Sequence, residues 1–435
     1  MKKNTDENLI QKCINISCYG KDDLNNNSFI FSWKTSLASF KDDLKYNLFK
    51  FNSKFEMPNS IVHIFNKEYK SSNEQEAQKY NRKISKIIYV SYRSKYKPQT
   101  NIKNNKIFTS DCGWGCMIRS SQMILCRALY KIFKYDYKLE GDIVKHIIPF
   151  IMDKNLNIVN NNYLGMDSYI TKLKELSKKD IVEIDPPFSI HKIVILGEKF
   201  GRTSGEWFSD FELPKIYDMI NTTFDIVPNL SIIHFNSFIE VKTILERCFK
   251  EIDSNKESNF LNDDNKNKIF EIEGKKYLME KMGLLFVSVR LGLDNVAPDY
   301  FPSIKNLFTC KECLGFIGGK KWTNSASYFF GYYENNLLFL DPHFNHQSID
   351  NLNNNNNIST YINKVIYKLD IKTLKAGFTI GFLFRNMKEF NELIEFLRVY
   401  KEEENPCFSF SDKLKKVEDE FIESDINQIS EQNDF

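Results

Sequence analysis

A glycine-rich turn that runs directly into a cysteine and an apolar helical pattern is the feature that most constrains this chain. Residues 109–120 read TSDCGWGCMIRS, and apolar residues then recur at helical spacing as far as Phe133. This pattern predicts a helix that begins at or just after Cys116, with the sulfur at the positive end of the helix dipole. Gly113 and Gly115 allow a tight turn that would expose the sulfur. The segment predicts a thiolate of lowered pKa, with a small buried structural cysteine as the alternative.

A base for such a thiolate has to come from the histidines of the chain, which are His63, His146, His191, His234, His343 and His346. His146 and His234 lie within apolar runs, so we expect them in the core or in a strand. His343 follows the apolar strand pattern 336–340, and Asp341 precedes it by two positions. Residues two apart in an extended chain point to the same side. Asp341 can therefore hold the imidazole of His343, as a thiolate–imidazolium pair requires, although an Asp-Pro-His tripeptide on its own indicates an ordinary turn.

Further motifs occur along the chain in one order, and with the segment 109–119 they resemble those of the autophagins, the papain-like cysteine proteases of autophagy. They are Tyr92-Arg93, Phe188–His191, Gly205–Trp207, Arg290–Leu293, Leu314–Lys320, Asn324–Ala326, Tyr328–Tyr332 and Leu340–His343. The resemblance extends from Val62 to Phe390, apart from insertions. It implies an α+β papain-like cysteine protease fold with a small accessory lobe.

The same resemblance implies a set of catalytic residues. Cys116 would be the nucleophile, His343 the base and Asp341 the carboxylate that orients the base. The oxyanion hole would consist of the Tyr92 hydroxyl and the backbone N–H of Cys116. No metal and no cofactor are implied, and Cys310 and Cys313 lack the second pair that a zinc site would need.

The resemblance also implies a groove that receives the substrate. Its residues would be Trp114, Trp207, Lys320, Lys321 and Trp322. The last three would belong to a gating loop, and here the chain departs from the family pattern. Residues 321–323 replace a family proline, and Ser327 stands where the family has histidine.

The implied activity is cleavage of a ubiquitin-like autophagy modifier of GABARAP type after its near-terminal glycine, in support of autophagosome formation. The same enzyme would release the lipidated form of the modifier by hydrolysing its glycine–phosphatidylethanolamine amide, in transient contact with autophagic membranes. Two alternatives are a papain-like hydrolase for a different ubiquitin-like protein and a non-catalytic scaffold that binds the modifier.

The composition agrees with an enzyme of a reducing compartment. The 435 residues are 42% hydrophobic, enough to bury a large core. Nine irregularly spaced cysteines argue against a secreted disulfide framework, and no apolar run approaches the roughly 18 residues of a membrane span. A net charge of +3 gives no indication of nucleic-acid binding. We therefore expect a cytoplasmic protein.

Local composition divides the chain into three regions. We expect an Asn-rich, partly flexible extension over 1–60, a protease domain over 61–400 and an acidic flexible tail over 401–435. Polar segments near 251–280 and 351–360 are expected to be loop insertions within the domain.

One charge pattern is not explained by these expectations. Between Lys79 and Lys106 the chain has nine Lys and Arg residues and no Asp or Glu. Such a run indicates either a solvated helix face followed by a loop, or a surface that docks on an acidic partner or an anionic membrane.

Overall fold

The computed structural model describes residues 55–56, 60–70, 74–139, 142–153, 171, 185–252, 268–321, 323–349, 358–362 and 365–414. Trp322 lies outside the described residues, as do nearly all of the expected extension 1–60 and most of the insertion 351–360.

The described elements are short to medium strands and a smaller number of helices. The strands are β1 (Ile61–Ile64), β2 (Lys67–Lys70), β3 (Tyr92–Thr100), β4 (Ile107–Ser110), β5 (Leu230–Asn236), β6 (Phe238–Glu240), β7 (Phe249–Ile252), β8 (Ile269–Ile272), β9 (Lys275–Met279), β10 (Met282–Asn295), β11 (Cys313–Lys320), β12 (Thr323–Tyr333), β13 (Asn336–Leu340), β14 (Asn345–Gln347), β15 (Tyr367–Asp370), β16 (Leu374–Phe384) and β17 (Ser409–Ser411). The α-helices are α3 (Glu74–Ile84), α4 (Cys116–Tyr135), α5 (Ile143–Ile147), α7 (Ile190–Gly197), α8 (Glu212–Phe224), α9 (Val241–Cys248), α12 (Phe301–Asn306) and α14 (Met387–Tyr400). In the described part of the chain, no helix is long and apolar enough to cross a membrane.

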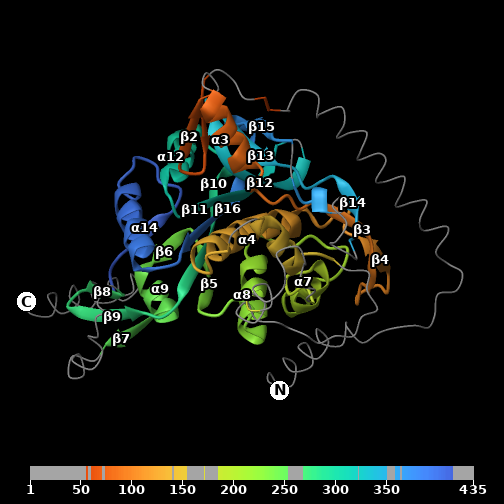
Figure 1. Cartoon of the computed structure of the whole chain (residues 1–435), viewed down its shortest axis with the longest axis horizontal. Coiled ribbons are helices and arrows are strands. Elements are labelled where there is room, and N and C mark those ends of the chain that lie inside the picture. Colours follow the sequence, from red (N-terminus) through yellow and green to blue (C-terminus); the bar gives the residue numbers. More distant parts are fainter. Residues whose placement is uncertain are drawn as a thin grey trace, which may run out of the picture.

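A central sheet organises the molecule (Figure 1). Its strands follow the order β15-β13-β12-β11-β16-β10-β5, and β1 and β2 extend it from β12. All neighbours along this order are antiparallel except β10 and β5, which are parallel. Two strands of this sheet lead into the candidate site, because β13 ends at Leu340 and β12 carries Ala326.

The sheet is buried on both faces, and the alternation of side chains along its strands divides them between two cores. In β10, Leu284 and Phe286 belong to one core, whereas Leu285 and Val287 belong to the other. Strand geometry explains this division, because successive side chains point to opposite faces.

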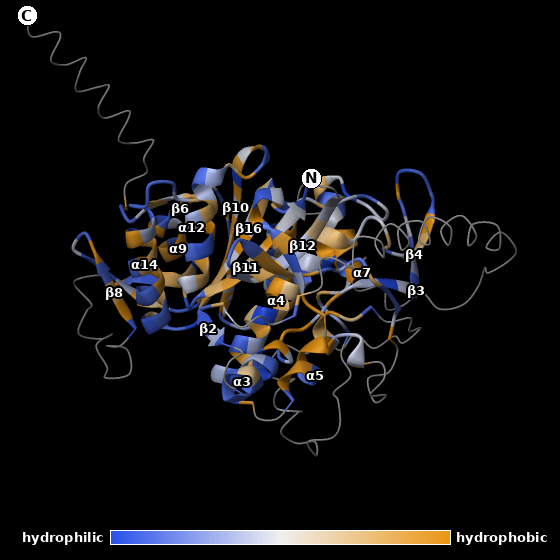
Figure 2. Cartoon of the chain, turned by 90° about the horizontal axis from the view of Figure 1, so that it is seen from above, coloured by the Kyte–Doolittle hydropathy of each residue, from blue (hydrophilic) through white to orange (hydrophobic). Residues whose placement is uncertain are grey.

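Helices cover both faces, so the body has three layers (Figure 2). Buried residues of α4, α5, α7 and α8 belong to the first core, and those of α9, α12 and α14 belong to the second. This mixed arrangement of helices and sheets confirms the α+β papain-like fold class.

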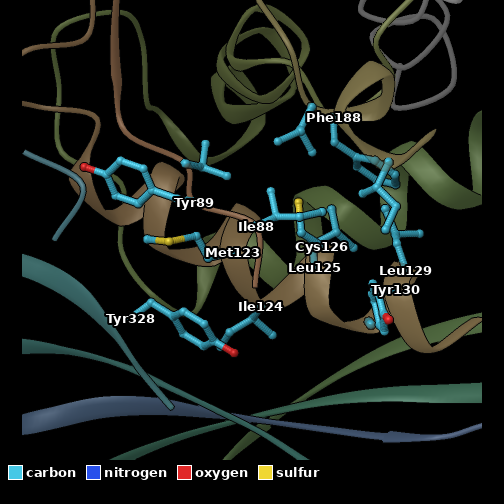
Figure 3. Close-up of a cluster of buried hydrophobic side chains, with 14 of the residues drawn as sticks. Ile88, Tyr89, Met123, Ile124, Leu125, Cys126, Leu129, Tyr130, Phe188 and Tyr328 are labelled. Carbon is cyan, nitrogen blue, oxygen red and sulfur yellow. The ribbon is translucent and has the colours of Figure 1, made fainter. Parts of the chain in front are cut away.

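Helix α4 is the centre of the first core. It begins at Cys116, as the glycine-rich turn and the apolar spacing predict. Figure 3 shows its apolar side chains between Tyr328 of β12 and Phe188. Ile124 packs directly on the sheet at Gly381, where an added Cβ would lie 2.8 Å from its Cγ2 atom. The nucleophile candidate therefore begins a helix that is fixed by packing along its length.

The described residues of the insertion near 251–280 form strands, and residues 253–267 lie outside the described residues. Strands β7, β9 and β8 form a small antiparallel sheet beside α9, at the edge of the body in Figure 1. Phe270 and Tyr277 are buried in the second core, and the ring of Phe270 lies 5.0 Å from that of Phe390. These aromatic residues explain why a segment of polar composition forms a sheet.

The folded body also extends past residue 400, where we expect the tail to begin. Strand β17 pairs in parallel with β6, and Cys407, Phe408 and Phe410 are buried. The ring of Phe408 lies 5.0 Å from that of Tyr400. The boundary expected at residue 400 is therefore too early, because these apolar side chains complete the second core.

This packing predicts that Phe408→Ala lowers the free energy of unfolding by about 3 kcal/mol, since it leaves a cavity in the second core. Ser409→Ala changes an exposed side chain one residue away and should stay within about 0.5 kcal/mol of wild type. Urea denaturation measures both variants. Equal stability of the two variants would show that this segment does not contribute to the core.

Candidate active site

The turn before α4 has a shape that only glycine permits at two positions. Gly113 has a φ of +85°, and a Cβ at Gly115 would lie 2.2 Å from Asp111 Oδ2. The backbone N–H of Gly115 donates to the Asp111 carbonyl oxygen over 2.9 Å. The chain therefore turns sharply around Asp111 and enters α4 at Cys116. No acidic residue occupies the first turn of α4, so the positive end of its dipole is available to a thiolate.

A buried ion network holds this turn. The Arg119 Nε lies 2.7 Å from Asp111 Oδ2, and its Nη1 lies 2.6 Å from Asp153 Oδ2. The side chains of all three residues are fully buried. Asp111 also accepts a hydrogen bond of 2.6 Å from the backbone N–H of Arg93. These roles are not predicted from the sequence, although an arginine within the apolar helical pattern, Arg119, is a signal for a buried ion pair.

The end of β13 presents Asp341 and His343 together. Asp341 Oδ1 is hydrogen-bonded to Nδ1 of His343 and accepts the backbone N–H of His343 over 3.2 Å. The Tyr89 hydroxyl fixes this corner by donating to the Asp341 carbonyl oxygen over 2.7 Å. With the Nδ1 proton directed at the carboxylate, the other ring nitrogen is the one available to a nucleophile.

The structure brings Cys116 into contact with His343. Burial alone would raise the pKa of the Cys116 thiol. A hydrogen bond and the charge of His343 outweigh that effect, and further hydrogen bonds come from the Ala326 backbone and the Tyr92 hydroxyl. The pKa of Cys116 is therefore lowered, as a nucleophilic thiolate requires.

The charge of Asp341 favours the protonated form of His343. Burial would lower the pKa of this imidazole, but the Asp341 carboxylate and the contact with Cys116 raise it above its ordinary value. The carboxyl group of Asp341 has a lowered pKa in spite of burial, because Lys320 and His343 flank it. A protonated imidazole between two anions is the charge arrangement of a thiolate–imidazolium pair.

Lys320 does not lie where the sequence leads us to expect it. We expect this lysine in a substrate-binding gate, but it is only 9% exposed and its Nζ lies 3.3 Å from Asp341 Oδ2. It also lies over the ring of Phe339, 4.8 Å from the centroid. This position makes Lys320 a partner of Asp341 behind the imidazole. Lys321 is exposed, and its backbone N–H donates to Thr373 over 2.9 Å.

Tyr92 lies beside the imidazole. Its ring stands edge-on to that of His343 with the centroids 5.2 Å apart, and its backbone N–H donates to the Pro342 carbonyl oxygen over 2.8 Å. Together with its hydroxyl contact to Cys116, this places Tyr92 beside both the sulfur and the imidazole.

The two tryptophans expected to wall the groove differ in exposure. Trp114 is 4% exposed, and its indole N–H donates to the Ser110 carbonyl oxygen over 3.0 Å, so it mainly supports the turn. Trp207 is 54% exposed, and its indole N–H donates to Gly113 over 2.8 Å. Asp210 fastens the Trp207 loop to the sheet by accepting a hydrogen bond of 2.6 Å from Thr379. Trp207 is therefore the indole that faces solvent beside the nucleophile turn.

The sulfur is less accessible than the glycine-rich turn predicts. Cys116 is only 6% exposed, because Tyr92, His343 and the backbone of Ala326 surround it. Ala326 follows the gate-loop segment along the chain, and no sequence motif predicts its contact with the sulfur. Little of the Cys116 side chain is therefore open to solvent.

Other thiols of the described residues differ in chemistry. Burial raises the pKa of Cys126, Cys248, Cys310, Cys313 and Cys407, to about 12 for Cys248, Cys313 and Cys407. Within the described ranges no group of three His, Cys, Asp or Glu side chains could hold a metal ion. The lowered pKa distinguishes Cys116 from these five buried thiols.

Comparisons with known proteins agree with this geometry. The peptidase C54 catalytic domain matches residues 77–396 of the chain. The chain is 25% identical over 405 residues to the cysteine protease ATG4D of Xenopus laevis, which covers 87% of this chain and 81% of that protein. It is 26% identical over 323 residues to the cysteine protease ATG4A of Homo sapiens, and this match covers 71% of this chain and 71% of that protein. A 29% identical match to the cysteine protease ATG4 of Cryptococcus neoformans spans 57% of this chain and 20% of that protein.

The coupled charges predict a pH dependence. The Cys116 thiolate exists above the lowered pKa of that thiol, and the His343 imidazolium that stabilises it depends on Asp341. Asp341→Asn removes the negative charge, lowers the pKa of His343 and thereby raises that of Cys116. The midpoint of Cys116 alkylation by iodoacetamide against pH should rise by about 1 pH unit or more.

His346→Ala is the matched control for this titration. Burial lowers the pKa of His346 to about 4, and its Nδ1 lies 2.7 Å from the Ser91 hydroxyl, so it takes no part in the charge pair. This variant should keep the wild-type midpoint. An unchanged midpoint in Asp341→Asn, or an equal rise in His346→Ala, would contradict the assignment of the base and its carboxylate.

Proposed function

Because the chain belongs to the peptidase C54 family of cysteine proteases, we propose that it cleaves a ubiquitin-like autophagy modifier after a glycine near its C-terminus. The observation that carries this proposal is that hydrogen bonds join Cys116, at the start of α4, to His343 and His343 to Asp341. We propose these three residues as nucleophile, base and orienting carboxylate. The names of the similar proteins support the choice of autophagy as the process.

The proposed chemistry is acyl transfer through a thioester. The Cys116 thiolate attacks the carbonyl carbon of the glycine, and the Tyr92 hydroxyl and the Cys116 backbone N–H stabilise the resulting oxyanion. Loss of one such donor typically lowers the rate by ~10²-fold. His343 protonates the leaving amine and then takes a proton from the water molecule that hydrolyses the thioester.

The same chemistry extends to the lipidated modifier. An amide between the glycine and phosphatidylethanolamine has the same carbonyl carbon and a primary amine as its leaving group. One site can therefore process the precursor and release the lipidated form, which requires transient contact with autophagic membranes. We propose a modifier of GABARAP type as the substrate and the cytoplasm as the location, where the thiol stays reduced.

Selection of glycine follows from the position of Trp207. Its exposed indole is fixed beside the nucleophile turn by the hydrogen bond to Gly113, and the sulfur is almost enclosed. A residue with no side chain passes such a constriction most easily. Trp207 therefore serves as the wall of the groove in this proposal, and Trp114 supports the turn that contains Gly113.

A panel of ubiquitin-like precursors tests the proposal. The purified chain is incubated with each precursor, and the masses of the products report cleavage after glycine. Processing of the autophagy modifier alone is the expected result. Processing of a different ubiquitin-like protein would favour the alternative hydrolase, and binding without cleavage would favour a non-catalytic scaffold.

We predict that Cys116→Ala lowers the rate of precursor cleavage by roughly 10⁴-fold or more, because the nucleophile is lost while the core stays filled. The variant should still bind the modifier. Cys112→Ala is the matched control four residues away and should remain active. Loss of activity in the Cys112 variant and its retention in Cys116→Ala would show that the nucleophile is misassigned.

We also predict that replacing the glycine before the cut with alanine lowers kcat/KM by about 10²-fold or more, since the added methyl meets the walls of the constriction. Trp207→Ala should lower kcat/KM for the glycine substrate. It should also reduce the ratio of kcat/KM between the glycine and the alanine substrate. Measuring kcat/KM for both substrates with both enzymes tests this. If the wild-type enzyme cleaved them equally well, glycine selection by the site would be ruled out.

A further inference from the structure

A group of cationic side chains lies between α3, β2 and the second half of α4, and the proposed catalysis does not use it. Two members contact the same phenyl ring: Lys83 Nζ lies 5.0 Å and Arg127 Cζ lies 4.3 Å from the centroid of Phe65. Three more lysines are close enough to repel the charge of Lys83. We call the group the cationic cluster, and its members are Lys67, Lys83, Arg127, Lys131 and Lys134.

Arg127 has aromatic contacts but no polar partner among the described residues. Neither a hydrogen bond nor an ion pair joins its guanidinium to another residue in the described part of the chain, and its Nε is a buried donor without a partner. Its contacts are the rings of Phe65 and, at 5.6 Å, Tyr130. A partly buried guanidinium without a counter-charge is unfavourable, because ring contacts replace only part of its hydration.

Lys83 responds to the same excess of positive charge. Burial lowers the pKa of its amine, and the neighbouring Arg127 and the three other lysines lower it further, to about 6. At neutral pH this amine therefore loses its proton unless an anion enters the cluster.

The carboxylates of this region are directed elsewhere. Glu312 and Glu389 act on Lys131, whose Nζ also donates to the Lys311 carbonyl oxygen over 3.0 Å. Glu389 also pairs with Arg385. These two carboxylates thus compensate the Lys131 side of the cluster, whereas Lys83 and Arg127 form no ion pair in the described part of the chain.

We propose that the cationic cluster is a binding site for a phosphate group. The guanidinium of Arg127 offers a planar fork that matches two phosphate oxygens, and Lys83 and Lys67 add point charges. The two negative charges of a phosphate dianion can compensate Arg127 and also stabilise the protonated form of Lys83, which the single charge of a carboxylate does not. Its source is either a soluble phosphate compound or a phosphorylated lipid headgroup, since both present the same chemistry.

This site is separate from the catalytic centre. Arg127 lies eleven residues after Cys116 along α4, which corresponds to roughly 17 Å at the helical rise.

The cationic cluster also accounts for part of the basic run between residues 79 and 106. The fold places members of this run in different surroundings. Arg93 of that run is buried against the ring of Tyr361 at 3.9 Å, and Lys103 pairs with Glu206 at 2.8 Å. Lys83 is the member of the run that joins the cluster.

The test is a titration of the full chain with inorganic phosphate at constant ionic strength, followed by thermal unfolding and by calorimetry. Wild type should show saturable stabilisation that chloride does not reproduce. Arg127→Gln should weaken phosphate binding by about tenfold or more, because a charge-assisted bidentate contact is lost. Without phosphate, this variant should be at least as stable as wild type, since it removes an uncompensated charge.

Arg82→Gln is the matched control, because it removes an exposed cation from the adjacent position of α3 and leaves the cluster intact. It should bind phosphate like wild type. Absence of saturable stabilisation in wild type would overturn the proposal, as would equal phosphate affinity of the Arg127 and Arg82 variants. Lys83→Gln provides a second variant if Arg127→Gln does not fold, and it too should weaken binding.

Vesicles distinguish the two sources of the phosphate. Phosphatidylcholine vesicles with and without phosphatidylinositol 4-phosphate are sedimented with wild type and with Arg127→Gln. Cosedimentation that needs both the phosphorylated lipid and Arg127 supports a headgroup as the ligand. Phosphate binding in solution without cosedimentation supports a soluble ligand. The proposed site would be contradicted if wild type and Arg127→Gln cosedimented equally with the phosphorylated lipid and also bound phosphate with equal affinity.

Discussion

The buried guanidinium of Arg119 is the interaction on which the rest of the site depends. It lies between the carboxylates of Asp111 and Asp153, and each carboxylate also accepts a backbone N–H from another element. Asp111 accepts from Arg93, next to Tyr92 in β3, and Asp153 accepts from Ile190, the first residue of α7. One cation thus ties β3, α4 and α7 together. Removal of a partner from such a buried pair typically costs about 3–5 kcal/mol.

The site itself is a line of alternating charges in a nearly closed environment. Lys320 faces Asp341, Asp341 faces His343, and His343 faces Cys116. Burial opposes ionisation of the thiol, and the neighbouring opposite charge outweighs it. The low exposure of the sulfur strengthens these interactions, because little water is present to screen them. Enclosure therefore both limits which residue can enter and maintains the reactive state of the thiol.

The sequence predicts the parts of this structure that depend on local periodicity. The apolar spacing after the glycine-rich turn predicts the start of α4 at Cys116, and the run 387–400 has the helical pattern of α14. The strand pattern 336–340 predicts that Asp341 and His343 lie together. What it does not predict depends on contacts between distant segments. The pairing of Lys320 with Asp341, the approach of Ala326 to the sulfur and the ordered segment after residue 400 arise from tertiary packing, which leaves no periodic signal.

The central claim is that His343 is the imidazolium of a charge pair with Cys116, and nitrogen NMR of histidine-labelled protein tests it most directly. The pKa of each of the other five histidines is lowered, chiefly by burial, so they should be neutral at pH 7. We predict one imidazolium among six histidines at pH 7, assigned to His343 by its loss in His343→Ala. In Cys116→Ala the pKa of this imidazole should fall, because the thiolate charge is removed. A neutral His343 at pH 7 in the wild-type protein, or a pKa unchanged by Cys116→Ala, would contradict the account.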